Sequence, residues 1–309
     1  MNKTTIAVVL TSLVFTACKK DESMASSNTI VDIVVNNNDF SLLEAAVVHA
    51  DLGSTLSGTG TFTVFAPNNA AFIAAGLDTE AKIKALPVAT VRSILQYHVL
   101  GQSVASSAIT SSTNSAVKTV SNVDLFVAKK TSGVFVNGAS VISADISASN
   151  GVIHVINKVL MPPVGNIVQA AQADANFTFL VAAVLRASEG STNVAQVLSG
   201  TGPFTVFAPT NQAFINAGFA NIAAIQAADP AVLTKILTYH VVSGRVLSSD
   251  LTEGVAPATL NGGTVTVTLA GGAKVKGANN TSASNITAVN TITTNGVIHV
   301  IDQVLLPNN

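Results

Sequence analysis

The stretch "GTGTFTVFAPNNAAFIAAG" at residues 58–76 returns almost unchanged as "GTGPFTVFAPTNQAFINAG" at residues 200–218. The two copies agree at fifteen of nineteen positions and lie 142 residues apart. Each copy begins with alternating apolar residues that end at a proline, which is typical of a β-strand. Each then continues into a short apolar segment that a glycine closes, which is typical of a helix. Asn68 and Thr210 precede these segments, and both residue types cap helix N-termini.

Three further blocks recur in the same order in both halves: "IVDIVVNNNDFSLLEAAV" (30–47) with "IVQAAQADANFTFLVAAV" (167–184), "YHV" (97–99) with "YHV" (239–241), and "NGVIHVINKVLMPP" (150–163) with "NGVIHVIDQVLLPN" (295–308). A period near 140 residues is far longer than the roughly 20–50 residues of a solenoid unit. The 309 residues therefore divide into two whole domains, which we expect at 29–163 and 164–309.

Each repeat places helical patterns before strand patterns. The segment "SLLEAAVVHADLG" predicts a helix with Ser41 as N-cap and Glu44 at the capping-box position. Residues 123–138 predict a hairpin that turns around Thr131–Gly133. Helices followed by strands predict an α+β fold for each domain.

Together, "TVFAPNNAAF", "YHV" and "VIHVINKVLMP" resemble the signatures of the fasciclin (FAS1) domain, and the second repeat carries the first signature as "TVFAPTNQAF". The resemblance implies two tandem FAS1 domains, each a β-wedge or sandwich of about seven strands flanked by short α-helices. It also implies roles in cell adhesion and in contact with extracellular matrix or polysaccharide, none of which needs a cofactor.

The repeated stretch is interpreted mainly as scaffold. Asn69 and Asn211 lie one residue inside their predicted helices, where a side-chain amide can bond backbone groups of a turn. The alternative is that these amides face a partner. Both residues are therefore kept as candidate partner-binding positions.

The Tyr-His pairs are the other candidates for partner binding: Tyr97, His98, Tyr239 and His240. In animal members of the family that the chain resembles, this region is linked to integrin recognition. A tyrosine can serve as a rigid anchor at an interface, or it can equally fill the core. His154 and His299 also recur, and a histidine pair could hold a metal. No carboxylate or cysteine recurs beside them, so we expect these imidazoles to bond the backbone instead.

Composition excludes several classes of function. The net charge is −1 and 10% of the residues are charged, which disfavours binding to nucleic acid. The chain has no G-x-S-x-G motif and no phosphate-binding loop, and no carboxylate recurs in a setting that suggests acid–base chemistry. We therefore predict no catalytic residues, no metal site and no cofactor.

The N-terminus predicts a secreted and lipid-anchored protein. Residues 1–17 have a lysine followed by an apolar run too short to span a bilayer, as in a signal peptide. Cys18 is the only cysteine and follows small residues, which resembles the lipid-attachment site of bacterial lipoproteins. Residues 18–28 then form the lipidated cysteine and its tether. Lys19 and the acids at 21–22 resemble a surface-export tag, so we expect the cell-surface side of the outer membrane.

These expectations combine into one functional prediction. The chain is predicted to be a surface adhesion lipoprotein whose two modules bind extracellular matrix, polysaccharide or a cell-surface protein. The alternative is a carrier of a small apolar ligand such as a carotenoid or a lipid, since the composition is rich in apolar residues.

Overall fold

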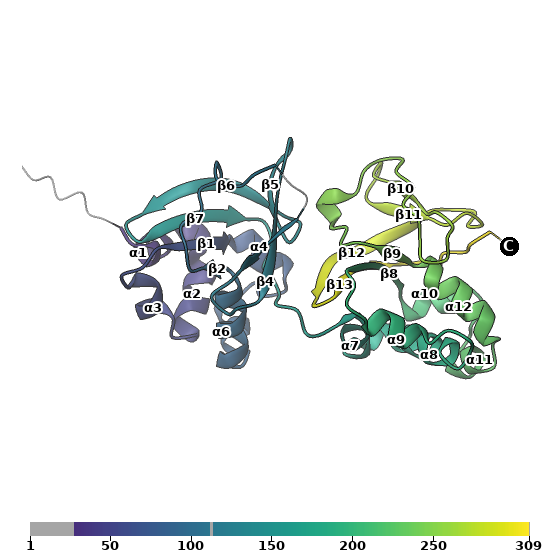
Figure 1. The fold of residues 1–309 in the computed structure, drawn as a ribbon. Coiled ribbons are helices and arrows are strands. Elements are labelled where there is room, and N and C mark those ends of the chain that lie inside the picture. The colour runs from purple at the N-terminus through teal and green to yellow at the C-terminus, as the bar shows by residue number, and fades with distance from the viewer. Residues whose placement is uncertain (1–27, 112–113, 309) are drawn as a thin grey trace, which may run out of the picture.

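The computed structural model describes residues 28–111 and 114–308, and it forms two lobes that follow one another along the chain (Figure 1). The first lobe runs from Ile30 to Ile156 and the second from Ile167 to Ile301. In both, helices cover one side of a curled sheet. The signal peptide, Cys18 and most of the tether predicted from the sequence lie outside the described residues.

The first domain contains short helices that cluster at the start and middle of the repeat and strands that dominate its end. Its elements are α1 (Ile30–Val35), η1 (Asn38–Phe40), α2 (Ser41–His49), α3 (Gly53–Ser57), β1 (Phe62–Pro67), α4 (Asn69–Ala74), α5 (Glu80–Lys84), α6 (Val88–Tyr97), β2 (Val99–Leu100), β3 (Ser115–Lys118), β4 (Asp124–Lys130), β5 (Gly133–Val136), β6 (Ala139–Ala148) and β7 (Gly151–Ile156).

The second domain repeats this order with small differences at the sheet edge. Its elements are α7 (Ile167–Gln172), η2 (Ala175–Phe177), α8 (Thr178–Ala187), α9 (Val194–Ser199), β8 (Phe204–Pro209), α10 (Asn211–Asn216), α11 (Ile222–Gln226), α12 (Pro230–Tyr239), β9 (Val241–Ser243), η3 (Ser248–Asp250), β10 (Thr266–Thr268), β11 (Lys274–Lys276), β12 (Ser284–Thr293) and β13 (Gly296–Ile301).

Among the described residues the first sheet has seven strands in the order β2-β1-β7-β6-β5-β4-β3, and the second has six in the order β10-β11-β12-β13-β8-β9. In each sheet one central pair is parallel: β1 with β7, and β8 with β13. The register runs from Phe62 opposite Gly151 to Pro67 opposite Ile156. The first and last signature blocks of each repeat are therefore neighbours in space, and the predicted α+β fold is confirmed.

Both faces of the central strand are buried, so each domain has two apolar layers. On β1, Val64 and Ala66 pack against the helices, while Phe65 packs with the strand-side cluster around Leu125. In the second domain, Val206 likewise packs against the helices and Phe207 packs in the strand-side cluster. Successive side chains of "TVFAP" therefore point into two different apolar cores, and neither face of the strand points to solvent.

Helix capping agrees with the sequence at some positions and differs at one. Asn68 and Thr210 cap α4 and α10 as predicted, accepting the N–H of Ala71 at 2.9 Å and of Ala213 at 3.3 Å. The predicted capping box of Ser41 is wrong, because α2 continues directly from η1 and Ser41 is already helical. The hairpin turn between Lys130 and Gly133 is confirmed.

A buried asparagine ties the first helix to the sheet in each domain. Asn150 accepts the N–H of Ile30 at 3.0 Å and donates to the carbonyls of Leu56 at 2.7 Å and Gly58 at 3.2 Å. Asn295 makes the matching three bonds in the second domain. One amide therefore satisfies backbone groups from α1, α3 and the following loop.

We predict that Asn150→Ala lowers the free energy of unfolding by roughly 2–4 kcal/mol, because it leaves buried backbone groups without partners. Urea denaturation monitored by circular dichroism measures the change. Gln102→Ala is the matched control, since Gln102 is exposed, and it should shift stability by less than about 0.5 kcal/mol. Equal stability of the two variants would contradict this role of Asn150.

Candidate functional site at the junction of the two domains

The tyrosines of the Tyr-His pairs lie inside the domains. Tyr97 and Tyr239 end α6 and α12, and both are fully buried. The Tyr97 hydroxyl donates to the carbonyl of Asp124 at 2.9 Å and accepts from Asn137 Nδ2 at 2.9 Å. Burial raises the pKa of Tyr97 to about 12. The Tyr239 hydroxyl likewise donates to the carbonyl of Thr264. Each hydroxyl joins the end of a helix to the strand layer.

The histidines beside them are equally enclosed. The Nδ1 atoms of His98 and His240 bond the carbonyls of Ile94 at 2.7 Å and Ile236 at 2.8 Å. Because a carbonyl only accepts, Nδ1 carries the proton and Nε2 is the acceptor. Each Nε2 then accepts a backbone N–H, from Leu160 at 2.9 Å in the first domain. Burial lowers the pKa of both histidines to about 4, so they are neutral at physiological pH.

This placement bears directly on the partner-binding role predicted for the pairs. Side chains of Tyr97, His98, Tyr239 and His240 are at most 2% exposed. A partner cannot touch them in this conformation, since their polar atoms are bonded internally. The structure gives them the alternative role, which is to fill the core and hold the helix end against the sheet.

The second pair of recurring histidines is also bonded to the backbone. The Nε2 atoms of His154 and His299 contact the carbonyls of Val104 at 2.9 Å and Val246 at 2.8 Å. Each ring stacks on a core phenylalanine with centroids 5.7 Å apart. In the described part of the chain, no group of three or more His, Cys, Asp or Glu side chains is arranged to hold a metal.

The two repeated asparagines bridge helices. Asn69 Oδ1 accepts the N–H of Leu42 at 3.1 Å, and its Nδ2 donates to the carbonyl of Asn38 at 2.9 Å. Asn211 Oδ1 likewise accepts the N–H of Phe179 at 2.9 Å, and its Nδ2 donates to the carbonyl of Ala175 at 2.9 Å. Each amide caps the N-terminus of α2 or α8 from a neighbouring helix, which replaces the cap that Ser41 does not provide. Both amide groups are thus occupied within the domain.

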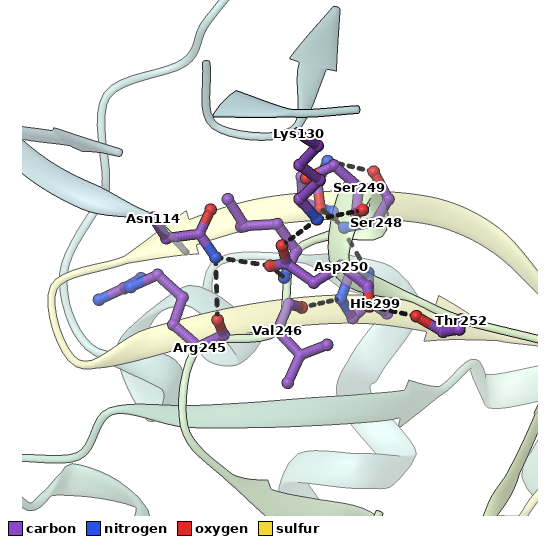
Figure 2. Close-up of polar contacts among 11 residues, drawn as sticks. Asn114, Lys130, Arg245, Val246, Ser248, Ser249, Asp250, Thr252 and His299 are labelled. Atoms are coloured by element: carbon purple, nitrogen blue, oxygen red, sulfur yellow. Dashed lines mark hydrogen bonds and ion pairs between the residues drawn. The ribbon is translucent and has the colours of Figure 1, made fainter. Parts of the chain in front are cut away.

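The polar contacts that join the two domains are made by residues outside the repeated blocks (Figure 2). Lys130 at the end of β4 pairs with Asp250 of η3, with Nζ and Oδ1 2.5 Å apart. The two side chains are 23% and 13% exposed, so solvent screens the pair only in part. Asp250 Oδ2 also accepts from Asn114 Nδ2 at 2.5 Å and from the N–H of Leu247 at 2.7 Å. One carboxylate therefore receives donors from both domains.

A cation–π contact and an apolar contact, both made by Phe126, adjoin this polar group. The guanidinium carbon of Arg245 lies 4.1 Å from the ring centroid of Phe126. Phe126 belongs to the first domain and packs against a buried cluster of the second domain, formed by Leu247, Ile292 and Val297. The junction thus combines a small hydrophobic centre with a hydrogen-bonded ion pair.

The sequence analysis did not identify these junction residues, because it followed what the repeats share. The loop after β2 and the loop after β9 correspond to each other at a spacing of 142 residues. In the first loop, Thr63 bonds residues 102 and 104, and in the second loop Thr205 bonds residues 244 and 246. At that spacing Ser103 stands where the second repeat has Arg245, and Ala108 where it has Asp250. Differences between the repeats were the available signal.

A cleft of about 650 Å³ opens beside the junction. It is lined by β3, β4 and their turn from the first domain, by Pro163 of the connecting segment, and by Arg245 and the end of β12 from the second domain. By contrast, two apolar cavities in the helical layers measure about 80 Å³ under α1–α3 and about 90 Å³ under α7–α9. Two further clefts measure about 570 Å³ beside α10 and about 310 Å³ beside α4. The largest of these spaces is one of two that residues of both domains line.

Comparison with known proteins identifies the fold family. The sequence profile described as "Fasciclin domain" matches residues 38–162 and 175–307, which together make up most of the chain. The chain belongs to the fasciclin family. The resemblance noted from the signature blocks is thereby confirmed for both halves.

Fasciclin relatives occur in bacteria and animals. The chain is 41% identical over 150 residues to protein sll1483 of Synechocystis, an alignment that covers 45% of this chain and 76% of the relative. It is 27% identical over 256 residues to transforming growth factor-beta-induced protein ig-h3 of the pig, covering 82% of this chain and 36% of the relative. The chain therefore spans about a third of that animal protein.

A solved fasciclin structure is also similar. It is the FAS1 domain pair of the insect cell adhesion molecule Fasciclin I, with a TM-score of 0.43 and 21% identity, covering 89% of this chain and 95% of that one. Fasciclin domains are found in adhesion and extracellular matrix proteins, and they are generally non-enzymatic modules.

The buried histidines of the fasciclin domains make stability depend on pH. His98, His240 and His299 have pKa values of about 4 in the folded state, below the ordinary 6.5. Between pH 6.5 and pH 4 these histidines are protonated in the unfolded chain but neutral in the folded chain. The folded state therefore loses stability as the pH falls through this window. We predict a loss of roughly 1 kcal/mol per pH unit and histidine.

Urea midpoints at pH 7.5 and pH 5.0 measure this effect. His240→Gln should lower stability at pH 7.5 and also reduce the difference between the two pH values, because one titrating group is gone. A midpoint in the unchanged protein that does not move between pH 7.5 and 5.0 would show that these rings are not held neutral.

The junction ion pair gives another prediction. Lys130→Ala leaves the carboxylate of Asp250 partly buried without its cation, and we expect a loss of roughly 1–3 kcal/mol and less cooperative unfolding of the two domains. Lys118→Ala is the control, since its pair with Asp124 is about half exposed and such pairs contribute little. Differential scanning calorimetry reports both effects, and identical traces for the two variants would contradict the prediction.

Proposed function

We propose that this protein is an adhesion lipoprotein of the bacterial cell surface. Its two fasciclin modules bind extracellular matrix, polysaccharide or a cell-surface protein, and it is not an enzyme. The observation that carries this proposal is that both halves of the chain match the fasciclin domain, a module found in adhesion and matrix proteins.

The N-terminal sequence supports the anchoring part of the proposal. After cleavage of residues 1–17, Cys18 would become the first residue and carry the acyl chains. Two or more acyl chains are sufficient for stable membrane attachment, whereas one chain alone is marginal. Within residues 28–111 and 114–308, none of the helices has the length and apolar character needed to cross a bilayer.

The tandem arrangement supports adhesion through many weak contacts. Two linked modules raise the effective concentration of the second contact once the first has formed, and several anchored copies add to this effect. The Lys130–Asp250 pair and the Phe126 contact hold the modules together, so less orientational freedom is lost on binding.

The alternative role as a carrier receives less support. Ligand pockets usually measure about 300–1,000 Å³. The apolar cavities of the two helical layers, at about 80 and 90 Å³, are too small to enclose a carotenoid or a lipid. The larger clefts, of about 650, 570 and 310 Å³, each have a charged residue in their lining, Arg245, Asp302 and Lys158 respectively, which suits a wholly apolar ligand less well.

We predict that deleting the gene reduces attachment of cells to polysaccharide-coated and matrix-coated surfaces, and that the unchanged gene restores it. Complementation with Cys18→Ala should release the protein from the membrane fraction, prevent incorporation of radiolabelled palmitate and fail to restore attachment. Attachment by the deletion strain at the level of the parent would refute the adhesion role, and palmitate incorporation into Cys18→Ala would refute the anchor site.

A further inference from the structure

The cleft between the domains has the properties of a ligand site. Its volume of about 650 Å³ lies in the middle of the usual range for small-molecule pockets. Its walls come from both domains and from Pro163 of the connecting segment. Pockets are frequent at such boundaries between domains.

Arg245 supplies the specific recognition group. Its Nη1 donates to the carbonyls of Thr293 at 3.2 Å and of Gly296, and its Cζ lies 4.1 Å from the centroid of the Phe126 ring. Arginine has five N–H donors. Among the described residues, the donors of Nε and Nη2 have no protein acceptor. Figure 2 shows the Arg245 side chain extending away from Asp250. The carboxylate of Asp250 therefore forms no ion pair with Arg245.

The guanidinium is half-buried and forms no ion pair within 4.0 Å in the described part of the chain, and the carboxylate of Asp124 in the same cleft acts on it only at longer range. Burial lowers the pKa of Arg245, and the nearby Tyr97 and Asp124 offset this only in part. Buried charges are ordinarily paired, because an unpaired one is costly. An anion entering the cleft would supply the missing partner through two parallel hydrogen bonds.

The charge of the cleft agrees with an anionic ligand. Its titratable lining residues are Lys118, Asp124 and Arg245. Lys118 and Asp124 neutralise each other across 2.8 Å. The remaining charge is the single positive charge of Arg245, in a chain whose overall net charge is −1. The local excess is therefore positive.

The rest of the lining suits a sugar. Pro163 and the exposed Pro203 offer apolar surface for the C–H face of a pyranose ring. Exposed Thr294 and Asn122 add a hydroxyl and an amide that can bond sugar hydroxyl groups. A carboxylate attached to a polyhydroxylated ring satisfies all of these groups together.

We propose that the cleft between the domains binds an acidic saccharide, with the carboxylate of a uronic acid residue on Nε and Nη2 of Arg245. This inference rests on the proposed adhesion function and assigns its ligand class and site. The saccharide lies across the junction and contacts both domains, so its binding also strengthens their association.

Isothermal titration of the full-length chain with trigalacturonate tests the proposal, with maltotriose as the neutral trimer and triglutamate as the acidic peptide. We expect binding of trigalacturonate, weakened by added salt, and at least tenfold weaker binding of the other two. Equal affinity for maltotriose would refute the role of the charge, and equal affinity for triglutamate would refute the saccharide assignment.

Two variants and one control locate the site. Arg245→Gln should weaken trigalacturonate binding about tenfold or more, because a charged bidentate contact is lost. Thr294→Trp, at an exposed position, should block the cleft without removing a folding contact. Arg186→Gln removes an arginine that is already paired with Glu189, so it should change the affinity less than twofold.

The outcomes separate this inference from the adhesion role. Unchanged affinity in a folded Thr294→Trp variant would refute the cleft as the site even where Arg245→Gln disturbs the junction. Absence of trigalacturonate binding combined with impaired attachment of the deletion strain would refute the inference alone. Normal attachment of the deletion strain would refute the proposed function.

Discussion

The structure depends on one parallel strand pair in each domain. The strand that carries "TVFAP" lies beside the strand that carries "GVIHVI", although about 90 residues separate them along the chain. Both faces of this pair are buried, one under the helices and one under the strand layer. A parallel pair needs a long crossover, and in this fold the crossover contains α4–α6 and the outer strands. The pair therefore organises both apolar layers.

The repeated polar residues act within this arrangement. His98 receives the backbone of Leu160 after β7, and Tyr97 bonds the start of β4, so the end of α6 is fixed at two points. Asn69 and Asn150 complete the backbone bonding of the first helices. These groups recur because the same buried backbone atoms need partners in both domains. Their recurrence is a consequence of folding, and it carries no information about a ligand.

The proposed saccharide recognition instead depends on where the repeats differ. Arg245 and Asp250 take the places of Ser103 and Ala108, and these exchanges occur where the second domain meets the first. Asp250 joins the domains through Lys130, while Arg245 lines the cleft. Ser103 and Ala108 have no charge and could make neither contact, so these exchanges give the second domain contacts that its first copy lacks.

The sequence by itself determined the duplication, the α+β class, the caps at Asn68 and Thr210 and the hairpin after Lys130. These features depend on local chemistry and periodicity, which a linear sequence displays. The tertiary structure alone decided that Tyr97 and His98 are interior, that Asn69 caps a helix 27 residues before it, and that Arg245 meets Phe126. Burial and contacts between distant segments depend on how the layers pack, and no local pattern encodes them.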